Sequence, residues 1–256
     1  MKILISNDDG IGSPGIDLLT RVMRTIGDVT VVAPDGGRSG MSSAFTVSKP
    51  LRLDKVFEEP GLVKYVSNGT PTDCVKLGLN EIFADEKPDL LVAGINHGAN
   101  SSTAVLYSGT LGCVFEGCEN DVLSIGFSLC NHSWATSTQY LEPYILPIVK
   151  KIIGLNPPKG LCFNVNAPEG PIKGAVLTRQ CRGHWGKEFE HRVDPHGRDY
   201  YWLTGEYFNH EPDATDTDET ALSNGYISIC PLKIDMTAHD YIRVMEQVNW
   251  QIWRSV

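Results

Sequence analysis

Strand-like and helix-like segments alternate along the first two thirds of the chain, and this alternation constrains the fold more than any other feature. The apolar run at residues 2–6 is followed by residues 14–26, whose apolar side chains recur at helical spacing, and then by the β-branched run 28–34. A β-α-β unit of this kind implies two parallel strands joined by a right-handed crossover. The chain therefore opens as an α/β fold.

The alternation continues to about residue 170 and predicts a doubly wound α/β core. Alternating apolar and polar residues between positions 44 and 68 indicate two strands, separated by a turn at 58–61. The remaining core elements are expected as helices and strands in turn, at 71–83, 89–94, 109–119, 122–129, 138–153 and 161–166. We therefore expect a single domain over residues 1–256, with a core of about residues 1–170.

The last third of the chain, residues 171–256, has a different pattern. Arg, His and aromatic residues concentrate between 171 and 210, with strand-like stretches at 175–179 and 200–205 and a turn at 194–199. This pattern predicts a β-hairpin that leaves the core as an arm, of the sort that pairs with another subunit. A further strand and a closing helix are expected at 225–232 and 237–253.

Composition and charge exclude several functional classes. The 256 residues are 41% hydrophobic and 21% charged, an ordinary globular mixture, and the apolar stretch at 90–95 is too short to cross a membrane. A formal net charge of -9 argues against general affinity for nucleic-acid polymers. Seven scattered cysteines without a Cys-x-x-Cys pair favour neither a disulfide framework nor a zinc site. Because the start lacks a signal-peptide pattern, we expect a cytoplasmic protein with no membrane partner.

Polar side chains follow three of the expected parallel strands, at the point where each strand ends. Asp8 and Asp9 follow the first strand, and the glycine-rich loop 35–43 follows the second. Asn96 and Asn100 follow a later one. Open parallel sheets bind their ligands at these carboxyl ends. Carboxylate, hydroxyl and amide oxygens suit Mg²⁺ or Mn²⁺, so the three strand ends together predict a metal site.

The adjacent aspartates also have a simpler explanation. Asn-Asp-Asp-Gly is a good turn sequence, and taken alone it is explained as well by a turn as by a site. Within a strand the two carboxylates would face opposite sides of the sheet, but just beyond its end a turn can bring both to one point. A divalent cation at that point would offset their repulsion. The other two polar strand ends favour the metal site over the turn.

Two segments are candidates for binding an anion. Gly40 lies in the loop after the second strand, where backbone amides can approach a phosphate closely, although the loop is by itself also explained as a flexible linker. Ser108, Gly109 and Thr110 open an expected helix, where free N–H groups and the helix dipole favour negative charge. Ser or Thr at such a position is more commonly an ordinary helix cap.

The histidines and aromatic residues of the last third give weaker signals. The spacing of the arm histidines fits no common zinc site, and a solvated hairpin explains them better; they are His184, His191 and His196. The sequence leaves His239 open as an acid or a structural residue. The arm aromatics are attributed to packing, with a contribution to a nucleoside pocket left open; they are Trp185, Tyr200, Tyr201 and Trp202.

Several of these motifs resemble the SurE family of survival-protein nucleotidases. The matching segments keep the family's order along nearly the whole chain and include ISNDDGIGSPGI from residue 5, APDGGRSGMSSAFT from 33, NGTPTDCV from 68, GINHGAN from 94, YSGTLGCVFEG from 107 and GYISICPLKIDMTAH from 225. Each segment is weak evidence by itself. The ordered set is highly specific.

The resemblance implies a metal-dependent phosphatase that removes phosphate from nucleoside 5′- and 3′-monophosphates and, in some members, from short polyphosphate. It implies one divalent cation per subunit, Mg²⁺ or Mn²⁺, held by Asp8, Asp9, Ser39 and Asn96. We assign catalysis to Asp8 and Asp9. Contacts to the phosphate oxygens are assigned to amides and hydroxyls of Gly40, Asn100, Ser108, Gly109 and Thr110.

The resemblance also implies a Rossmann-like α/β/α core with a protruding β-hairpin and a C-terminal arm. Members of the family form dimers or tetramers, so we expect a homodimer or homotetramer assembled through both extensions. Asp235 and His239 match positions near the hinge of the C-terminal arm. Where the family tends to have Gly and Asp, this chain has Ser102 and Ala104, a difference that bears on the loop's conformation and on substrate preference.

Three alternatives remain open from the sequence. In the first, Asp8 attacks phosphorus to form an aspartyl-phosphate, whereas in our preferred route a metal-activated water attacks and Asp9 orients or deprotonates it. The second is a phospho-acceptor signalling module, which would need an acceptor Asp where this chain has Asn96. The third is a metal-dependent deacetylase, which would usually need a zinc-binding His beside the acidic pair, and the sequence shows none there.

Overall fold

A nine-stranded sheet forms the centre of the protein, whose computed structural model describes residues 1–131, 133 and 136–248. The strands are β1 Lys2–Ser6, β2 Asp28–Pro34, β3 Leu53–Glu59, β4 Leu62–Ser67, β5 Leu90–His97, β6 Leu123–Leu129, β7 Leu161–Ala167, β8 Ala175–Leu177 and β13 Ile227–Lys233. Their order across the sheet is β3-β4-β2-β1-β5-β6-β7-β13-β8. The strands from β4 to β7 in this order are parallel, whereas β3 and β13 run antiparallel to their neighbours β4 and β7.

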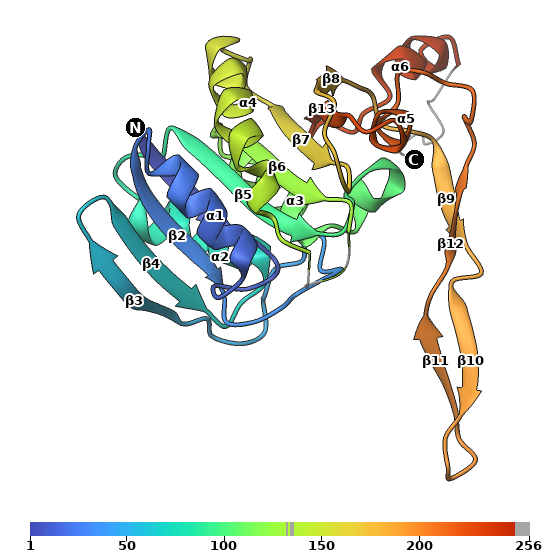
Figure 1. Ribbon diagram of the computed structural model, residues 1–256, viewed down its shortest axis with the longest axis horizontal. Helices are drawn as coiled ribbons and strands as arrows, with labels where there is room; N and C mark the ends of the chain where they lie inside the picture. Colours follow the sequence, from blue (N-terminus) through green and yellow to red (C-terminus); the bar gives the residue numbers. More distant parts are fainter. Residues whose placement is uncertain (132, 134–135, 249–256) are drawn as a thin grey trace, which may run out of the picture.

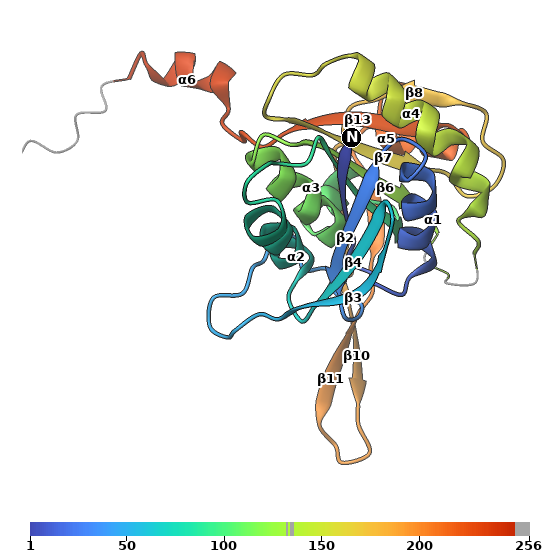
Figure 2. The same ribbon diagram turned by 90° about the vertical axis from the view of Figure 1, so that its left-hand side faces the viewer.

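Helices cover both faces of this sheet (Figures 1 and 2). They are α1 Pro14–Met23, α2 Pro71–Leu77, α3 Gly109–Glu119, α4 Glu142–Gly154 and α5 Asp218–Ser223, whereas α6 His239–Met245 lies away from the sheet (Figure 2). Helices α1 and α4 contact each other on one face, and α2 and α3 contact each other on the opposite face. Successive side chains of β1 alternate accordingly, because Ile3 and Ile5 enter one core cluster and Leu4 enters the other. The expected doubly wound α/β core is confirmed.

The strand order reverses direction between β1 and β5. From β1 the chain crosses over α1 to β2 on one side, and it later returns to place β5 on the other side of β1. Ser6 at the end of β1 lies beside Ala93 of β5. Ligands of open α/β sheets bind in the crevice at such a switch point, so the residues that follow β1 and β5 occupy the position of a site.

Several expected elements differ in the structure. Residues 44–52 form no strand, and β3 begins only at Leu53, because Pro50 cannot donate to a ladder. The helix expected at 71–83 changes at Leu77 into a π-helical turn over Gly78–Ile82. The stretch 175–179 is no part of the hairpin, since β8 pairs with β13 in the central sheet.

The predicted arm is present and leaves the body of the protein as a long antiparallel ribbon (Figure 1). Its strands are β9 Gly183–Gly186, β10 Phe189–Val193, β11 Asp199–Leu203 and β12 Glu206–Asn209. Strand β9 pairs with β12 near the base, and β10 pairs with β11 toward the tip. At the tip the Asp194 carboxylate accepts the backbone N–H of His196 and of Arg198, which closes the turn.

The closing helix α6 extends away from the body (Figure 2). It is shorter than expected at its start, and none of its residues is buried. Residues 249–253 of the expected helix lie outside the described residues. His239 is the first residue of α6, and its Nε2 lies 2.6 Å from the carboxylate of Asp235. Among the described residues, no helix is long and apolar enough to cross a membrane.

Candidate active site

The turn after β1 is closed by Asn7 rather than by the two aspartates. Its side-chain amide donates to the carbonyl of Gly10 at 3.1 Å and to Oγ of Ser13 at 2.7 Å, and its Oδ1 accepts the N–H of Gly10. Gly10 has φ of +99°, a conformation that L side chains rarely adopt. The carboxylates of Asp8 and Asp9 are therefore not needed to form the turn, which weakens the explanation of this stretch as a turn alone.

Asp8 is a buried carboxylate at the start of α3. Its residue surface is only 3% exposed, and the hydroxyl of Thr110 donates to its Oδ1. A Cβ at Gly109 would lie 2.7 Å from Cβ of Asp8, so only glycine lets the helix approach this closely. Burial raises the pKa of Asp8 to about 6, with the Thr110 hydroxyl lowering it and the Asp9 charge raising it further. A nearby cation would reverse this shift.

Asp9 presents an unsatisfied carboxylate oxygen. Its side chain is 3% exposed, and its Oδ2 has no hydrogen-bond partner among the described residues. Nδ1 of His97 lies 3.6 Å away, which is beyond a normal hydrogen bond. Burial raises the pKa of Asp9, and His97 partly offsets this. Buried carboxylate oxygens are almost always paired, so this atom indicates a place for a ligand.

Asn96 and Ser39 come to the same edge of the sheet. A register shift between β5 and β6 lies at Gly94 and Asn96. The Asn96 side chain donates its Nδ2 to the carbonyl of Gly98 at 2.8 Å, which leaves Oδ1 as its ligand atom. The N–H of Arg38 donates to the Asp8 carbonyl at 2.7 Å, so the loop that carries Ser39 is fixed beside the acidic pair.

This donor set fits a hard divalent cation. It offers two carboxylates, an amide oxygen and a hydroxyl, and one buried carboxylate oxygen lacks a partner. Within the described ranges, no group of three or more His, Cys, Asp or Glu residues has the arrangement of a metal site. The candidate site therefore depends on oxygens from Ser39 and Asn96 and not on acidic residues alone.

The residues assigned to phosphate differ in how available they are. Ser108 caps α3, since its Oγ accepts the N–H of Leu111 at 3.1 Å, and this agrees with the simpler explanation of that serine. Gly40 is exposed, with φ of +72°. Asn100 already has hydrogen-bond partners within the protein. Its Nδ2 donates to Oγ of Ser128, and its backbone N–H donates to Oδ1 of Asn166 on β7. A phosphate contact through that amide requires the bond to Ser128 to be exchanged.

Comparison with known proteins shows the family of this chain. The family model described as "Survival protein SurE" matches residues 3–187. The chain belongs to the SurE family. A relative from Flavobacterium psychrophilum named 5′-nucleotidase SurE is 45% identical, over 98% of this chain and 97% of its own. A relative of the same name from Bacteroides fragilis is 43% identical over 98% and 97%. The solved SurE protein of Aquifex aeolicus has a TM-score of 0.83 at 34% identity, covering 96% and 99% of the two chains.

Sequence reasoning missed one member of this SurE site, His97. The sequence argument against a deacetylase held that no histidine accompanies the acidic pair, and this is wrong in three dimensions, because His97 lies beside Asp9. Its position directly after Asn96 was the available signal. The family match and the absence of a three-ligand cluster in the described part of the chain still favour the phosphatase over the deacetylase.

A further buried carboxylate, also missed by sequence reasoning, links this SurE site to the base of the arm. Asp218 at the start of α5 is fully buried and accepts the N–H of Ser102 at 2.8 Å and of Cys181 at 2.9 Å. Tyr207 of β12 donates its hydroxyl to Oγ of Ser102 at 2.7 Å. Ser102, one of the two departures from the family pattern, is thus the contact between the loop after β5 and the arm.

Proposed function

We propose that this SurE chain is a metal-dependent phosphatase that hydrolyses nucleoside 5′-monophosphates to nucleoside and phosphate. The observation that carries the proposal is the buried Oδ2 of Asp9, which makes no hydrogen bond among the described residues, beside the buried carboxylate of Asp8 at the switch point of the sheet. The relatives named 5′-nucleotidase SurE cover nearly the whole chain and supply the substrate class. Nucleoside 3′-monophosphates and short polyphosphate are proposed as further substrates.

The metal in this proposal is one Mg²⁺ or Mn²⁺ per subunit, with ligands from Asp8, Asp9, Ser39 and Asn96. When bound, such a cation neutralises phosphate charge and lowers the pKa of a water molecule. The Thr110 hydroxyl holds Oδ1 of Asp8 in one orientation, and the glycine at 109 keeps the positive end of α3 against that carboxylate. These contacts fix the ligand geometry before the substrate arrives.

Asp9 is the residue proposed to orient and deprotonate the attacking water. Its Oδ2 makes no hydrogen bond among the described residues, so it can accept a proton from that water. The amides and hydroxyls of the phosphate set would hold the three equatorial oxygens of the phosphoryl group; this set comprises Gly40, Asn100, Ser108, Gly109 and Thr110.

The environment of Asp8 favours water over Asp8 as the nucleophile. One of its oxygens accepts the Thr110 hydroxyl, and the other packs close to Gly109. An in-line attack on phosphorus would need one of these oxygens to be released. A phosphorylated Asp8 trapped during turnover would overturn the water route.

Phosphate release tests the proposed function directly. The protein is assayed with a panel of nucleoside 5′- and 3′-monophosphates in Mg²⁺ or Mn²⁺, then again after EDTA. We expect release that requires the metal and returns when the metal is restored. No metal-dependent release from any monophosphate would contradict the proposal.

The assembly is also a proposal. The arm carries exposed large apolar side chains along β10 and β11, so we propose a homodimer or homotetramer that covers them. A role for α6 in the same assembly is proposed from its lack of buried residues. The cytoplasmic location and the single-domain organisation expected from the sequence stay predictions.

A further inference from the structure

A pocket lies beside the candidate metal site, along the loop after β2. Its volume is about 320 Å³, and its lining comes from that loop, from the segment before β3 and from the turn before α2. The lining residues are Gly37, Arg38, Ser39, Met41, Thr46, Lys49, Asn68, Gly69 and Thr70. The pocket shares Ser39 with the proposed metal ligands, so it adjoins the place where the reacting phosphate binds.

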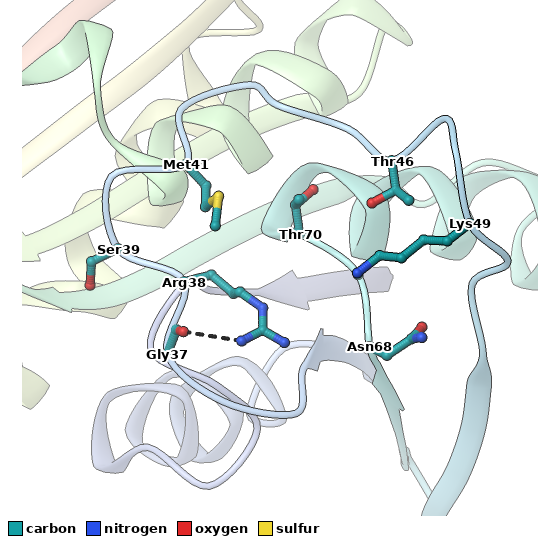
Figure 3. Close-up of a pocket in the computed structure, with 9 residues that line it drawn as sticks. Gly37, Arg38, Ser39, Met41, Thr46, Lys49, Asn68 and Thr70 are labelled. Carbon is teal, nitrogen blue, oxygen red and sulfur yellow. Dashed lines mark hydrogen bonds between the residues drawn. The ribbon is translucent and has the colours of Figure 1, made fainter.

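Two cations reach into this pocket from opposite sides. In Figure 3 the guanidinium of Arg38 and the ammonium of Lys49 extend toward the same space, whereas the hydroxyl of Ser39 is turned away from it. Arg38 is paired with Asp35 at 2.7 Å on the loop. Among the described residues Lys49 makes no ion pair. No Asp or Glu lines the pocket, although the chain as a whole carries a net charge of -9.

Two hydroxyls that line the pocket already form hydrogen bonds within the protein. The hydroxyl of Thr70 donates to the carbonyl of Ala44 at 2.6 Å, and the hydroxyl of Thr46 donates to Asp73 at 2.6 Å. The positive charge of the pocket comes from Lys49, which makes no ion pair among the described residues, and from Arg38, whose one ion pair is with the exposed Asp35. Like charges that converge on one hollow repel each other unless an anion lies between them.

We propose that the Arg38–Lys49 pocket binds a second phosphate group, carried on the leaving group of the substrate. The inference rests on the proposed function, since the first phosphate occupies the neighbouring metal site. The backbone N–H of Arg38 holds the Asp8 carbonyl at 2.7 Å, which makes the two subsites adjacent along one loop. The substrate class is then phosphate esters that carry a second phosphate on the leaving group, such as nucleoside 3′,5′-bisphosphates.

The reaction itself is unchanged by the second phosphate. Water forms the new P–O bond at the phosphorus in the metal site, the bond from that phosphorus to the leaving-group oxygen breaks, and that oxygen takes up a proton. The second phosphate stays intact on the product. Its contribution is binding, so its loss changes KM more than kcat.

The test compares three substrates in the Mn²⁺-loaded protein: AMP, adenosine 3′,5′-bisphosphate and tripolyphosphate. The variant is Lys49→Met, and Lys150→Met on α4 is the matched control, because it removes the same charge from an exposed site on the opposite face. For Lys49→Met we expect KM for the bisphosphate to rise about tenfold, the effect of losing one charge-assisted hydrogen bond, with KM for AMP within about twofold. For Lys150→Met we expect both KM values to stay unchanged.

The outcomes separate this inference from the proposed function. A KM rise for tripolyphosphate without one for the bisphosphate overturns the inference, because short polyphosphate already belongs to the proposed function. Equal effects on AMP and both other substrates, or no effect on any, overturn the inference while the phosphatase stands. If the wild-type protein releases no phosphate at all, the proposed function fails. Calorimetric binding of adenosine 3′,5′-bisphosphate then decides the pocket, with binding at least about tenfold weaker in Lys49→Met supporting it and equal binding refuting it.

Discussion

The end of β1 and the protruding arm depart from the usual distribution of residues in opposite ways. Asp8 at the end of β1 is a charged residue that is only 3% exposed, whereas Trp202 on the arm is a large apolar residue that is 58% exposed. Charged side chains are seldom buried without a partner, and exposed apolar patches mark interfaces. These departures are the basis for the two proposals, a cation at the end of β1 and another subunit against the arm.

The two regions also differ in how they are held. Side-chain hydrogen bonds from Asn7, Thr110 and Asn96 fix the strand ends within the core. The arm depends on its own two-stranded ladder and on the contacts of Asp218 and Tyr207 at its base. A substitution at a strand end should therefore change the rate of phosphate release, and a substitution on the arm should change the association of subunits.

The largest effect is expected from Asp8→Asn. This change removes one negative ligand and leaves the side-chain shape, so phosphate release should fall at least about 10³-fold, the size expected when a central electrostatic group is lost. The fold should persist, because the amide relieves the cost of a buried charge. Steady-state kinetics and thermal unfolding measure the two results.

Asp54→Asn is the control for that change. Asp54 is an exposed aspartate on β3, and its replacement should leave activity within about twofold, because it lies outside the proposed site. Full activity in Asp8→Asn would remove Asp8 from the metal site.

The pH dependence of stability gives the next largest effect, in protein freed of metal by EDTA. Because the folded-state pKa of Asp8 is about 6 and its ordinary value is 3.8, the folded protein binds more protons than the unfolded chain between these values. The Asp8 contribution to stability is therefore present below about pH 4 and is lost as pH rises through 6, by roughly 3 kcal/mol.

Urea unfolding at several pH values measures this change. Asp9 titrates in both proteins, so the readout is the difference between wild type and Asp8→Asn. That difference should grow in favour of the variant between pH 4 and 6. A constant difference across this range would show that folding does not raise the pKa of Asp8.

Trp202→Ser tests the arm. If another subunit covers this side chain, its loss should weaken the assembly by about 2 kcal/mol, or roughly 30-fold in the dissociation constant, as for a central interface residue. Light scattering over a dilution series measures the mass. Phe57→Ser on β3 is the control, because Phe57 is also an exposed aromatic residue but lies away from the arm. Equal masses for wild type and Trp202→Ser at every concentration would refute the proposed interface.

The smallest effect is expected where the two regions meet. Tyr207→Phe removes the hydroxyl that donates to Ser102, at a cost of about 1 kcal/mol in the free energy of unfolding. Activity should change by less than about threefold, since the proposed metal ligands are untouched. Tyr201→Phe, at an exposed position of β11, should change neither quantity. A larger loss of activity in Tyr207→Phe would mean that the arm controls the site.

The parallel core and the strand ends were predictable because apolar periodicity and strand order fix which loops meet. The hairpin was predictable from its turn sequence. The loss of a strand at 44–52 was also open to prediction, from Pro50. Two contacts were not predictable. The contact of His97 with Asp9 depends on the bulge in β5, and the burial of Asp218 depends on a residue more than a hundred positions away. Local sequence carries no signal for contacts of that range.

Diffraction from crystals soaked in Mn²⁺, recorded at the manganese absorption edge, tests the central claim most directly. We expect one anomalous peak per chain at the ends of β1 and β5, about 2.1–2.3 Å from oxygens of Asp8 and Asp9, with Asn96 and Ser39 completing the protein ligands. A protein that releases phosphate in Mn²⁺ but shows no peak between these two aspartates would contradict the account.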